Sequence, residues 1–110
     1  MSFDLEKMAA RAPAAVTLLK AMANERRLFI LCYLHQHQEA TVNTLVEALG
    51  MSQSALSQHL AWLRRDGLVQ TRKVGLQVYY RLNSEVAMSV MGVLHQHFCA
   101  LDADDTSLAE

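Results

Sequence analysis

A polar stretch in the middle of the chain carries residue types that can read DNA bases. On a helix at about 100° per residue, residues 52–65 would turn Leu56, Leu60 and Leu63 toward a core. The opposite face offers short hydroxyls and amides with little charge, from Gln53, Ser54, Ser57 and Gln58. This face suits base reading, because glutamine can bond adenine bidentately and serine can donate or accept. A solvated polar face that binds nothing would show the same pattern, so the helix alone leaves both interpretations open.

Basic residues flank this predicted reading face. They are Arg64, Arg65, Arg72, Lys73 and Arg81, and between residues 64 and 81 they are opposed by Asp66 alone. The net charge of the whole chain is −1, so the distribution of charge, rather than its sum, favours a nucleic acid. We expect the arginines at the end of the helix, with Arg72 and Lys73, to hold phosphates, which positions a protein on DNA without reading its sequence.

Two cysteines, Cys32 and Cys99, are the residues best suited to covalent chemistry. A secreted disulfide scaffold would carry more cysteines at closer spacing, and in a reducing compartment we expect these two as free thiols. A thiol enzyme is one alternative, but the chain has no Cys-x-x-Cys, and no motif sets up a Ser-His-Asp triad or a carboxylate pair. The sequence therefore predicts no enzyme. A reactive thiol and a small buried hydrophobe remain open interpretations of each cysteine.

Capping residues mark the helices that would position these groups. Each precedes a segment with helical apolar spacing and can accept a hydrogen bond from its first turn; they are Asn24, Thr41, Ser52 and Ser84. Gly50 would end the helix that follows Thr41, so two helices would meet at a tight turn over residues 50–52. Such a pair forms a helix-turn-helix.

The remaining segments show other patterns. Residues 4–22 are predicted as a helix interrupted or restarted at Pro13, because proline is tolerated in a first helical turn. An apolar helix follows through residues 28–34, and a polar break at 35–39 ends it. Alternating β-formers around Gly75 predict a β-hairpin. A last helix is expected from Glu85 to about Ala100.

Composition predicts a mainly α-helical domain with one small hairpin: four helices, the hairpin and a fifth helix. The chain has 110 residues, 52% of them hydrophobic, and one proline. We expect a single domain over residues 1–101 and a disordered acidic tail over 102–110. No apolar run approaches the roughly 20 residues of a membrane span, and the start does not look like a secretion signal. We therefore expect a cytoplasmic protein without a membrane partner.

Three segments resemble the ArsR/SmtB family of dimeric winged-helix regulators. They are residues 19–28 (LKAMANERRL), 51–60 (MSQSALSQHL) and 63–69 (LRRDGLV). The resemblance covers about residues 15–99 and implies a winged helix-turn-helix that binds double-stranded operator DNA as a homodimer through its first and last helices. It implies base reading by Gln53, Ser54, Ser57 and Gln58, and places the wing from Arg72 to Gln77.

The resemblance also bears on what such a regulator senses, because members usually release DNA when an inducer binds. One metal site of the family needs thiols where this chain has residues 41–44 (TVNT). Another needs acidic and histidine ligands along the last helix, and no register of His95 or His97 supplies them. We therefore expect no metal site and no cofactor. A metal or metalloid sensor that uses the two thiols stays the alternative within the family.

The two cysteines and their surroundings resemble the persulfide-sensing, HlyU/BigR-like branch of the family, most of all its HlyU-like members. The matching segments are residues 23–28, 30–32, 61–69 and 97–99. The resemblance implies that reactive sulfur species or oxidants bridge Cys32 and Cys99, directly or through extra sulfur atoms, and that DNA affinity then falls. A dimer that has lost DNA binding is the remaining alternative, and the intact polar face at Ser57 and Gln58 speaks against it.

Overall fold

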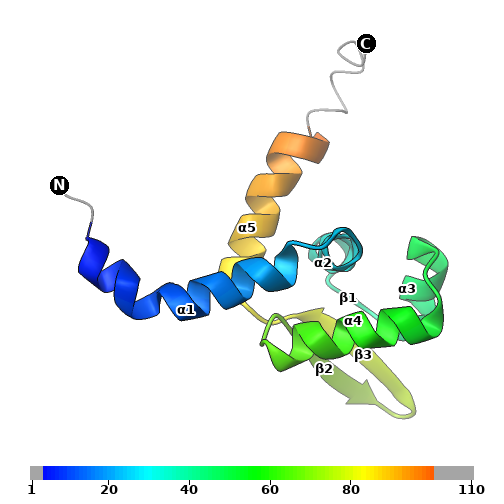
Figure 1. Cartoon of the computed structure of the whole chain (residues 1–110). Helices are drawn as coiled ribbons and strands as arrows, with labels where there is room; N and C mark the ends of the chain where they lie inside the picture. The colour runs from blue at the N-terminus through cyan, green and yellow to red at the C-terminus, as the bar shows by residue number, and fades with distance from the viewer. Residues whose placement is uncertain (1–3, 101–110) are drawn as a thin grey trace, which may run out of the picture.

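The computed structural model describes residues 4–100 and forms a helical domain with a small antiparallel sheet (Figure 1). Its elements, in chain order, are α1 (Leu5–Met22), α2 (Glu25–His37), β1 (Glu39–Ala40), α3 (Val42–Leu49), α4 (Gln53–Arg65), β2 (Val69–Val74), β3 (Gln77–Leu82), α5 (Glu85–His95) and the π-helical turn η1 (Gln96–Ala100). This order confirms the predicted winged helix-turn-helix. The predicted acidic tail lies outside the described residues.

The predicted caps account for where four of the helices begin. In each case the side-chain oxygen accepts a hydrogen bond from the backbone N–H three residues later, which satisfies a donor that has no partner inside the helix. The distances are 3.0 Å for Asn24, 3.2 Å for Thr41, 3.2 Å for Ser52 and 3.0 Å for Ser84. Gly50 ends α3 in the left-handed region, with φ of 69°, as expected of a glycine after a helix.

Two predicted helix boundaries are wrong. Helix α1 runs through Pro13 without a break; the site is exposed, so water can hydrate the carbonyl that the missing N–H leaves free. Helix α2 continues to His37 instead of stopping at His35. The polar residues there occupy the last helical turn, where the His37 ring stacks on Tyr33 with centroids 4.1 Å apart.

The sheet has one strand more than the predicted hairpin. Strands β2 and β3 pair around Gly75 as expected, and β1 adds to the other side of β3, which gives the order β1-β3-β2. The last helix also differs from prediction, since α5 gives way at Gln96 to the wider turn η1.

One apolar cluster holds these elements together. It includes Ile30, Leu31 and Leu34 from α2, with residues from α3, α4, β2, β3 and α5 packed around them. Helix α1 touches this cluster mainly through its last turn, at Ala21 and Met22, and its remaining length projects from the body (Figure 1). No helix within residues 4–100 is both long enough and apolar enough to cross a bilayer.

Candidate functional site

The exposed side of α4 carries the predicted base-reading residues. The other side of α4 packs against the core through Leu56, Leu60 and Leu63, which are all buried. Met51, in the turn before α4, is also buried and belongs to the same apolar cluster. Gln53, Ser54, Ser57 and Gln58 are all exposed to solvent. The fold therefore presents short polar groups on the exposed side of a helix whose other side is buried.

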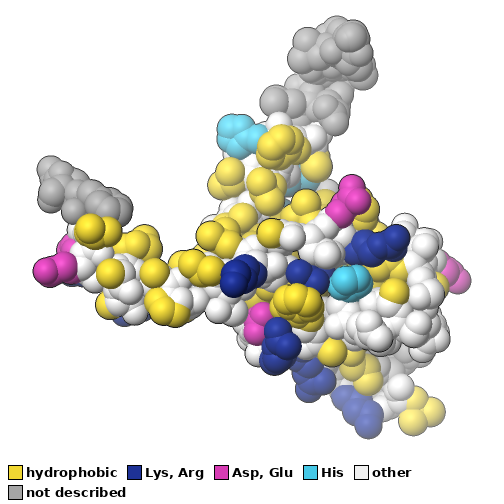
Figure 2. All heavy atoms as spheres, in the orientation of Figure 1, with side chains coloured by type: hydrophobic (Ala, Val, Ile, Leu, Met, Phe, Trp, Pro, Cys, Tyr) yellow, Lys and Arg dark blue, Asp and Glu magenta, His cyan; other side chains and the backbone are white. Residues whose placement is uncertain are grey.

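Basic side chains gather next to this helix, over its C-terminal end and the hairpin (Figure 2). Arg64 and Arg65 are exposed on the last turn of α4, and Lys73 and Gln77 are exposed near the tip of the hairpin. The predicted backbone-contacting residues are therefore accessible to solvent at the end of α4 and on the hairpin. Their roles toward DNA stay predictions.

Arg72 on β2 forms an ion pair with Glu39 on β1, and this partner was not predicted from the sequence. Its Nη2 lies 2.6 Å from Oε2 of Glu39, and its Nε lies 3.3 Å from Oε1. The guanidinium also lies over the Tyr79 ring, 5.2 Å from its centroid. Hydrogen bonding to Glu39, and then the charge of Glu39, raise the pKa of Arg72. Arg72 therefore reaches over β3 to β1, while 46% of its side chain stays exposed to solvent.

This ion pair predicts that Glu39 limits the contribution of Arg72 to DNA binding. A phosphate must compete with the carboxylate, so Glu39→Gln should raise affinity for any DNA sequence severalfold. The slope of log K against log salt concentration should become steeper, by up to the amount expected for about one additional phosphate contact. Fluorescence anisotropy across a salt series measures both quantities. Glu47→Gln on α3 makes the same charge change at an exposed site, and an equal gain there would show that net charge alone is responsible.

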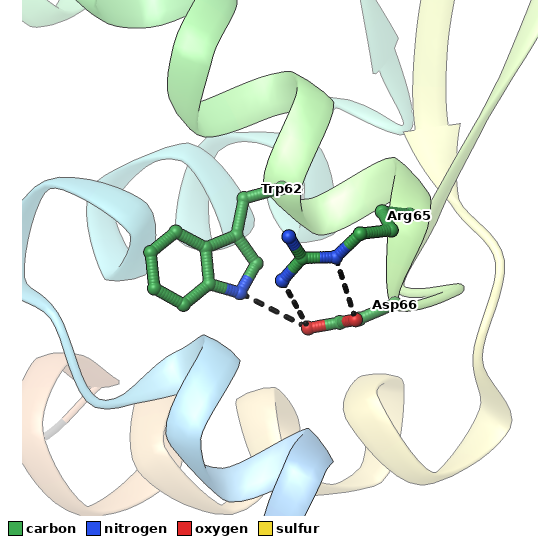
Figure 3. A network of polar contacts seen from close by, with 3 residues as sticks. All are labelled: Trp62, Arg65 and Asp66. Carbon is green, nitrogen blue, oxygen red and sulfur yellow. Dashed lines mark hydrogen bonds and ion pairs between the residues drawn. The ribbon is translucent and has the colours of Figure 1, made fainter.

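A second polar network closes the C-terminal end of α4 (Figure 3). The indole Nε1 of Trp62 donates to Oδ2 of Asp66 at 3.0 Å, and Nε of Arg65 donates to Oδ1 at 3.2 Å. Asp66 thereby orients both side chains at the point where the helix ends. Arg65 keeps 67% of its side chain exposed, so it remains accessible to a phosphate.

Arg27 links this network to the end of α1, and neither its burial nor this link was predicted from the sequence. Its side chain is only 5% exposed. Its Nε donates to the carbonyl of Ala21 at 2.7 Å and its Nη2 to that of Lys20 at 3.3 Å, both in the last turn of α1. The guanidinium lies 3.8 Å from the centroid of the Trp62 ring. Burial lowers the pKa of Arg27 and the charge of Asp66 opposes that shift, but a guanidinium stays charged.

The charge of Arg27 also affects a histidine of α4. His59 lies one helical turn before Trp62 and is half-buried. Burial, and then the charges of Arg27 and Arg26, lower its pKa below the ordinary value of about 6.5. His59 is therefore neutral at neutral pH and adds no positive charge next to the reading face.

The two cysteines line the same pocket, which lies between α2 and the end of α5 and measures about 320 Å³. Cys32 is half-buried on α2, and Cys99 is exposed in η1; both are free thiols. Because η1 is wider than an α-helical turn, it rotates Cys99 back toward the face that carries Met91. Burial, and then the neighbouring Cys99, raise the pKa of Cys32. The structure therefore brings together two residues far apart in the sequence.

Two histidines lie near the thiols, one on α2 and one on α5. The rings of His35 on α2 and His95 on α5 are 6.2 Å apart, and Nδ1 of His35 is buried without a hydrogen-bond partner among the described residues. Between residues 4 and 100, no three His, Cys, Asp or Glu side chains are grouped so that they could hold a metal ion.

Apolar side chains lie exposed along α1 and α5, the helices predicted to form a dimer (Figure 2). They include Leu5, Met8, Val16, Leu19, Val86 and Val93. The two helices meet in a shallow pocket that Leu18, Val86 and Val90 help to line. An exposed apolar surface of this kind is typical of a protein-protein contact.

Comparison with known proteins identifies relatives. Residues 24–71 match the family model described as bacterial regulatory protein, arsR family. The transcriptional activator HlyU of Vibrio cholerae is 53% identical over 96 residues, which cover 87% of this chain and 88% of HlyU. The solved structure of reduced HlyU from Vibrio cholerae superposes with a TM-score of 0.80 at 53% identity, over 86% of this chain and 98% of that one.

Two further solved structures share the fold. The transcriptional repressor BigR from Xylella fastidiosa has a TM-score of 0.79 at 36% identity, over 89% of this chain and 99% of that one. The homodimeric winged helix-turn-helix DNA-binding domain of Mb0332 from Mycobacterium bovis has a TM-score of 0.73 at 30% identity, over 100% of this chain and 96% of that one.

Proposed function

The chain belongs to the ArsR family of bacterial regulatory proteins, as its sequence predicts, and from that membership we propose how it works. It is a DNA-binding transcriptional regulator related to HlyU, and its relatives are regulators rather than enzymes. We propose that it binds operator DNA as a homodimer and releases it when the Cys32/Cys99 dithiol is oxidised or persulfidated. The observation that carries this proposal is that Cys32 and Cys99 line one pocket, and that α2, which carries Cys32, also contacts α4 through Arg27 and Trp62.

In this proposal the exposed side of α4 contacts base edges, while the end of α4 and the hairpin, which is the wing, contact the phosphate backbone of the DNA. The polar groups of α4 are short and uncharged, so they can satisfy base edges, whereas the charged side chains around them attract phosphates of any sequence. Gln53, Ser54, Ser57 and Gln58 are the reading residues. Arg64, Arg65, Arg72, Lys73 and Gln77 are the holding residues.

Variants on the two surfaces should separate these roles. Ser57→Ala or Gln58→Ala should relax sequence preference at one position per half-site, at a cost of about 1–3 kcal/mol per lost base contact. Arg72→Ala or Lys73→Ala should weaken binding to all sequences and flatten its salt dependence. Affinities for a set of single-base operator variants distinguish the outcomes. A changed base preference in the wing variants, with none in the helix variants, would reverse the assignment.

The homodimer is proposed on the exposed apolar residues of α1 and α5. An isologous contact would bury them on both protomers at once, and two-fold closure is the commonest arrangement of soluble oligomers. The related domain of Mb0332 is a homodimer. Two α4 helices would then face half-sites about one helical turn apart.

Sedimentation should therefore show a dimer at micromolar concentration. Leu19→Glu, on the exposed side of α1, should shift the protein toward monomer, because a carboxylate would have to be desolvated at the interface. Leu76→Glu makes the same change at the hairpin tip, where the side chain is 99% exposed, and should leave the dimer intact. A wild-type chain that sediments as a monomer at this concentration would contradict the proposed assembly.

The proposed switch needs two thiols and one reagent. A persulfide R–S–S–H transfers its outer sulfur to Cys99, which becomes Cys99–S–S–H and releases R–SH. Cys32 then attacks the Cys99 sulfur, so that a Cys32–Cys99 disulfide forms and H₂S leaves. A second sulfur transfer before closure leaves an extra sulfur atom in the bridge. With a peroxide R–O–O–H, one thiol becomes a sulfenic acid and R–OH leaves; condensation with the second thiol then expels water.

A bridge would tie η1 to α2, and α2 also carries Arg27. Because Arg27 contacts both the end of α1 and Trp62 of α4, a displacement of α2 would change how the two reading helices of a dimer are spaced. DNA binding by the reduced protein, and by protein treated in turn with persulfide, peroxide and zinc, tests the proposal. Release by persulfide or peroxide supports it, whereas release by zinc alone would favour a metal sensor.

A further inference from the structure

We propose that the pocket between α2 and α5 selects the inducer by polarity: it admits organic hydropersulfides with an uncharged apolar substituent and disfavours charged ones. This inference rests on the proposed dithiol function and names the class of reagent that reaches the thiols. Three properties of the pocket carry it, namely its volume, its wall and the unequal accessibility of its two thiols.

The pocket is larger than a sulfur bridge requires. Its volume of about 320 Å³ falls at the lower end of the range for small-molecule sites, about 300–1,000 Å³. One or two bridging sulfur atoms would fill a small part of it, since a water molecule in liquid occupies about 30 Å³. The remaining space can accommodate a short alkyl chain or an aromatic ring attached to the reacting sulfur.

The wall of the pocket is apolar. Besides the two thiols it is lined by Leu28, Phe29, Met91, Leu94, His95 and Phe98. None of these is Lys, Arg, Asp or Glu, and the surface they turn to the pocket consists of carbon and sulfur atoms. A carboxylate or ammonium group entering this space would lose hydration without gaining a partner. An apolar substituent would instead be stabilised by leaving water.

The two thiols differ in access, which gives the reaction an order. Cys99 is exposed while Cys32 is half-buried, so a reagent meets Cys99 first and transfers its outer sulfur there, releasing R–SH. The pKa of Cys32 is raised by burial and by Cys99, which keeps Cys32 a neutral thiol until the second step. While the first step proceeds, the substituent R occupies the apolar space beside Phe29 and Phe98.

Rates of sulfur transfer to the reduced full chain test the inference. Benzyl hydropersulfide and glutathione persulfide are each followed by mass spectrometry, and each rate is divided by the rate with the same chain unfolded in urea, which removes intrinsic reactivity. The folded chain should favour the benzyl reagent by at least about tenfold, the smaller end of what one methylene contributes in an apolar pocket. Phe98→Lys should lower this ratio, because Phe98 is 71% exposed and a lysine there would pair with the carboxylates of glutathione.

Phe29→Lys tests the same point from the facing helix, and Leu76→Lys at the hairpin tip is the matched control that should leave the ratio unchanged. Equal normalised rates for the two reagents would overturn the selectivity while leaving the dithiol switch intact. If neither reagent produced a bridged chain, both this inference and the proposed switch would fail. A ratio that fell equally in all three lysine variants would also overturn it, because net charge would then be the cause.

Discussion

Cys32→Ser and Cys99→Ser should each bind operator DNA normally when reduced and should each fail to release it after persulfide treatment. Wild-type affinity should fall by about 5- to 150-fold on the same treatment, the range of a coupling free energy of 1–3 kcal/mol. Neither single variant can form the intramolecular bridge, and the chain has only two cysteines. Fluorescence anisotropy with and without persulfide measures the effect.

Controls separate loss of the bridge from loss of packing. Serine places a hydroxyl where Cys32 is half-buried, so Cys32→Ala, which keeps the site apolar, should behave like Cys32→Ser. Mass spectrometry of the treated wild type should show a loss of two hydrogens, or that loss plus whole sulfur atoms, within one chain. If either single variant still released DNA after treatment, the dithiol mechanism would be wrong and another inducer would take its place.

Local signals in the sequence predicted most of the fold. The caps at Asn24, Thr41, Ser52 and Ser84 act on the adjacent turn, so they work without tertiary context. The leucine spacing of α4 also predicted which side is buried. The errors arose where a local signal is weak: Pro13 lies in an exposed helix that tolerates it, and a polar residue such as His35 does not end a helix by itself.

The contacts that organise the candidate site could not be predicted in this way. Glu39 and Arg72 are far apart in the chain and meet only because β1 joins the sheet, and that two-residue strand has no pattern of its own. The common pocket of the two thiols was expected only from family resemblance, because nothing in the residues between Cys32 and Cys99 fixes how α5 crosses α2. The burial of Arg27 was the hardest feature to predict, since a charged residue in a first helical turn is usually solvated.

Arg27 is nevertheless the residue whose loss should destabilise the protein most. Arg27→Met should lower the free energy of unfolding by about 3–5 kcal/mol, because hydrogen bonds from a charged donor contribute about 1.5–3 kcal/mol and a partly desolvated cation–π contact about 1–2 kcal/mol. The carbonyl of Ala21, which now accepts at 2.7 Å, would lose its charged donor in a buried setting. Total stability of a domain is about 5–15 kcal/mol, so this is a large share. Urea unfolding at one fixed protein concentration gives the value, since dimer stability depends on concentration.

Arg26→Met is the matched control, because Arg26 is exposed and its replacement should change stability by no more than about 0.5 kcal/mol. Arg27→Lys should lie between the two, since an ammonium keeps the charge but cannot stack its plane on Trp62 or bond two carbonyls in a fork. Trp62 is the single tryptophan, so its emission reports on the contact directly and should shift to the red in Arg27→Met but not in Arg26→Met. Equal stability of the Arg26 and Arg27 variants would mean that α1, α2 and α4 are held by the apolar cluster without this link. The route proposed from the thiols to the reading helix would then have no physical connection through Arg27.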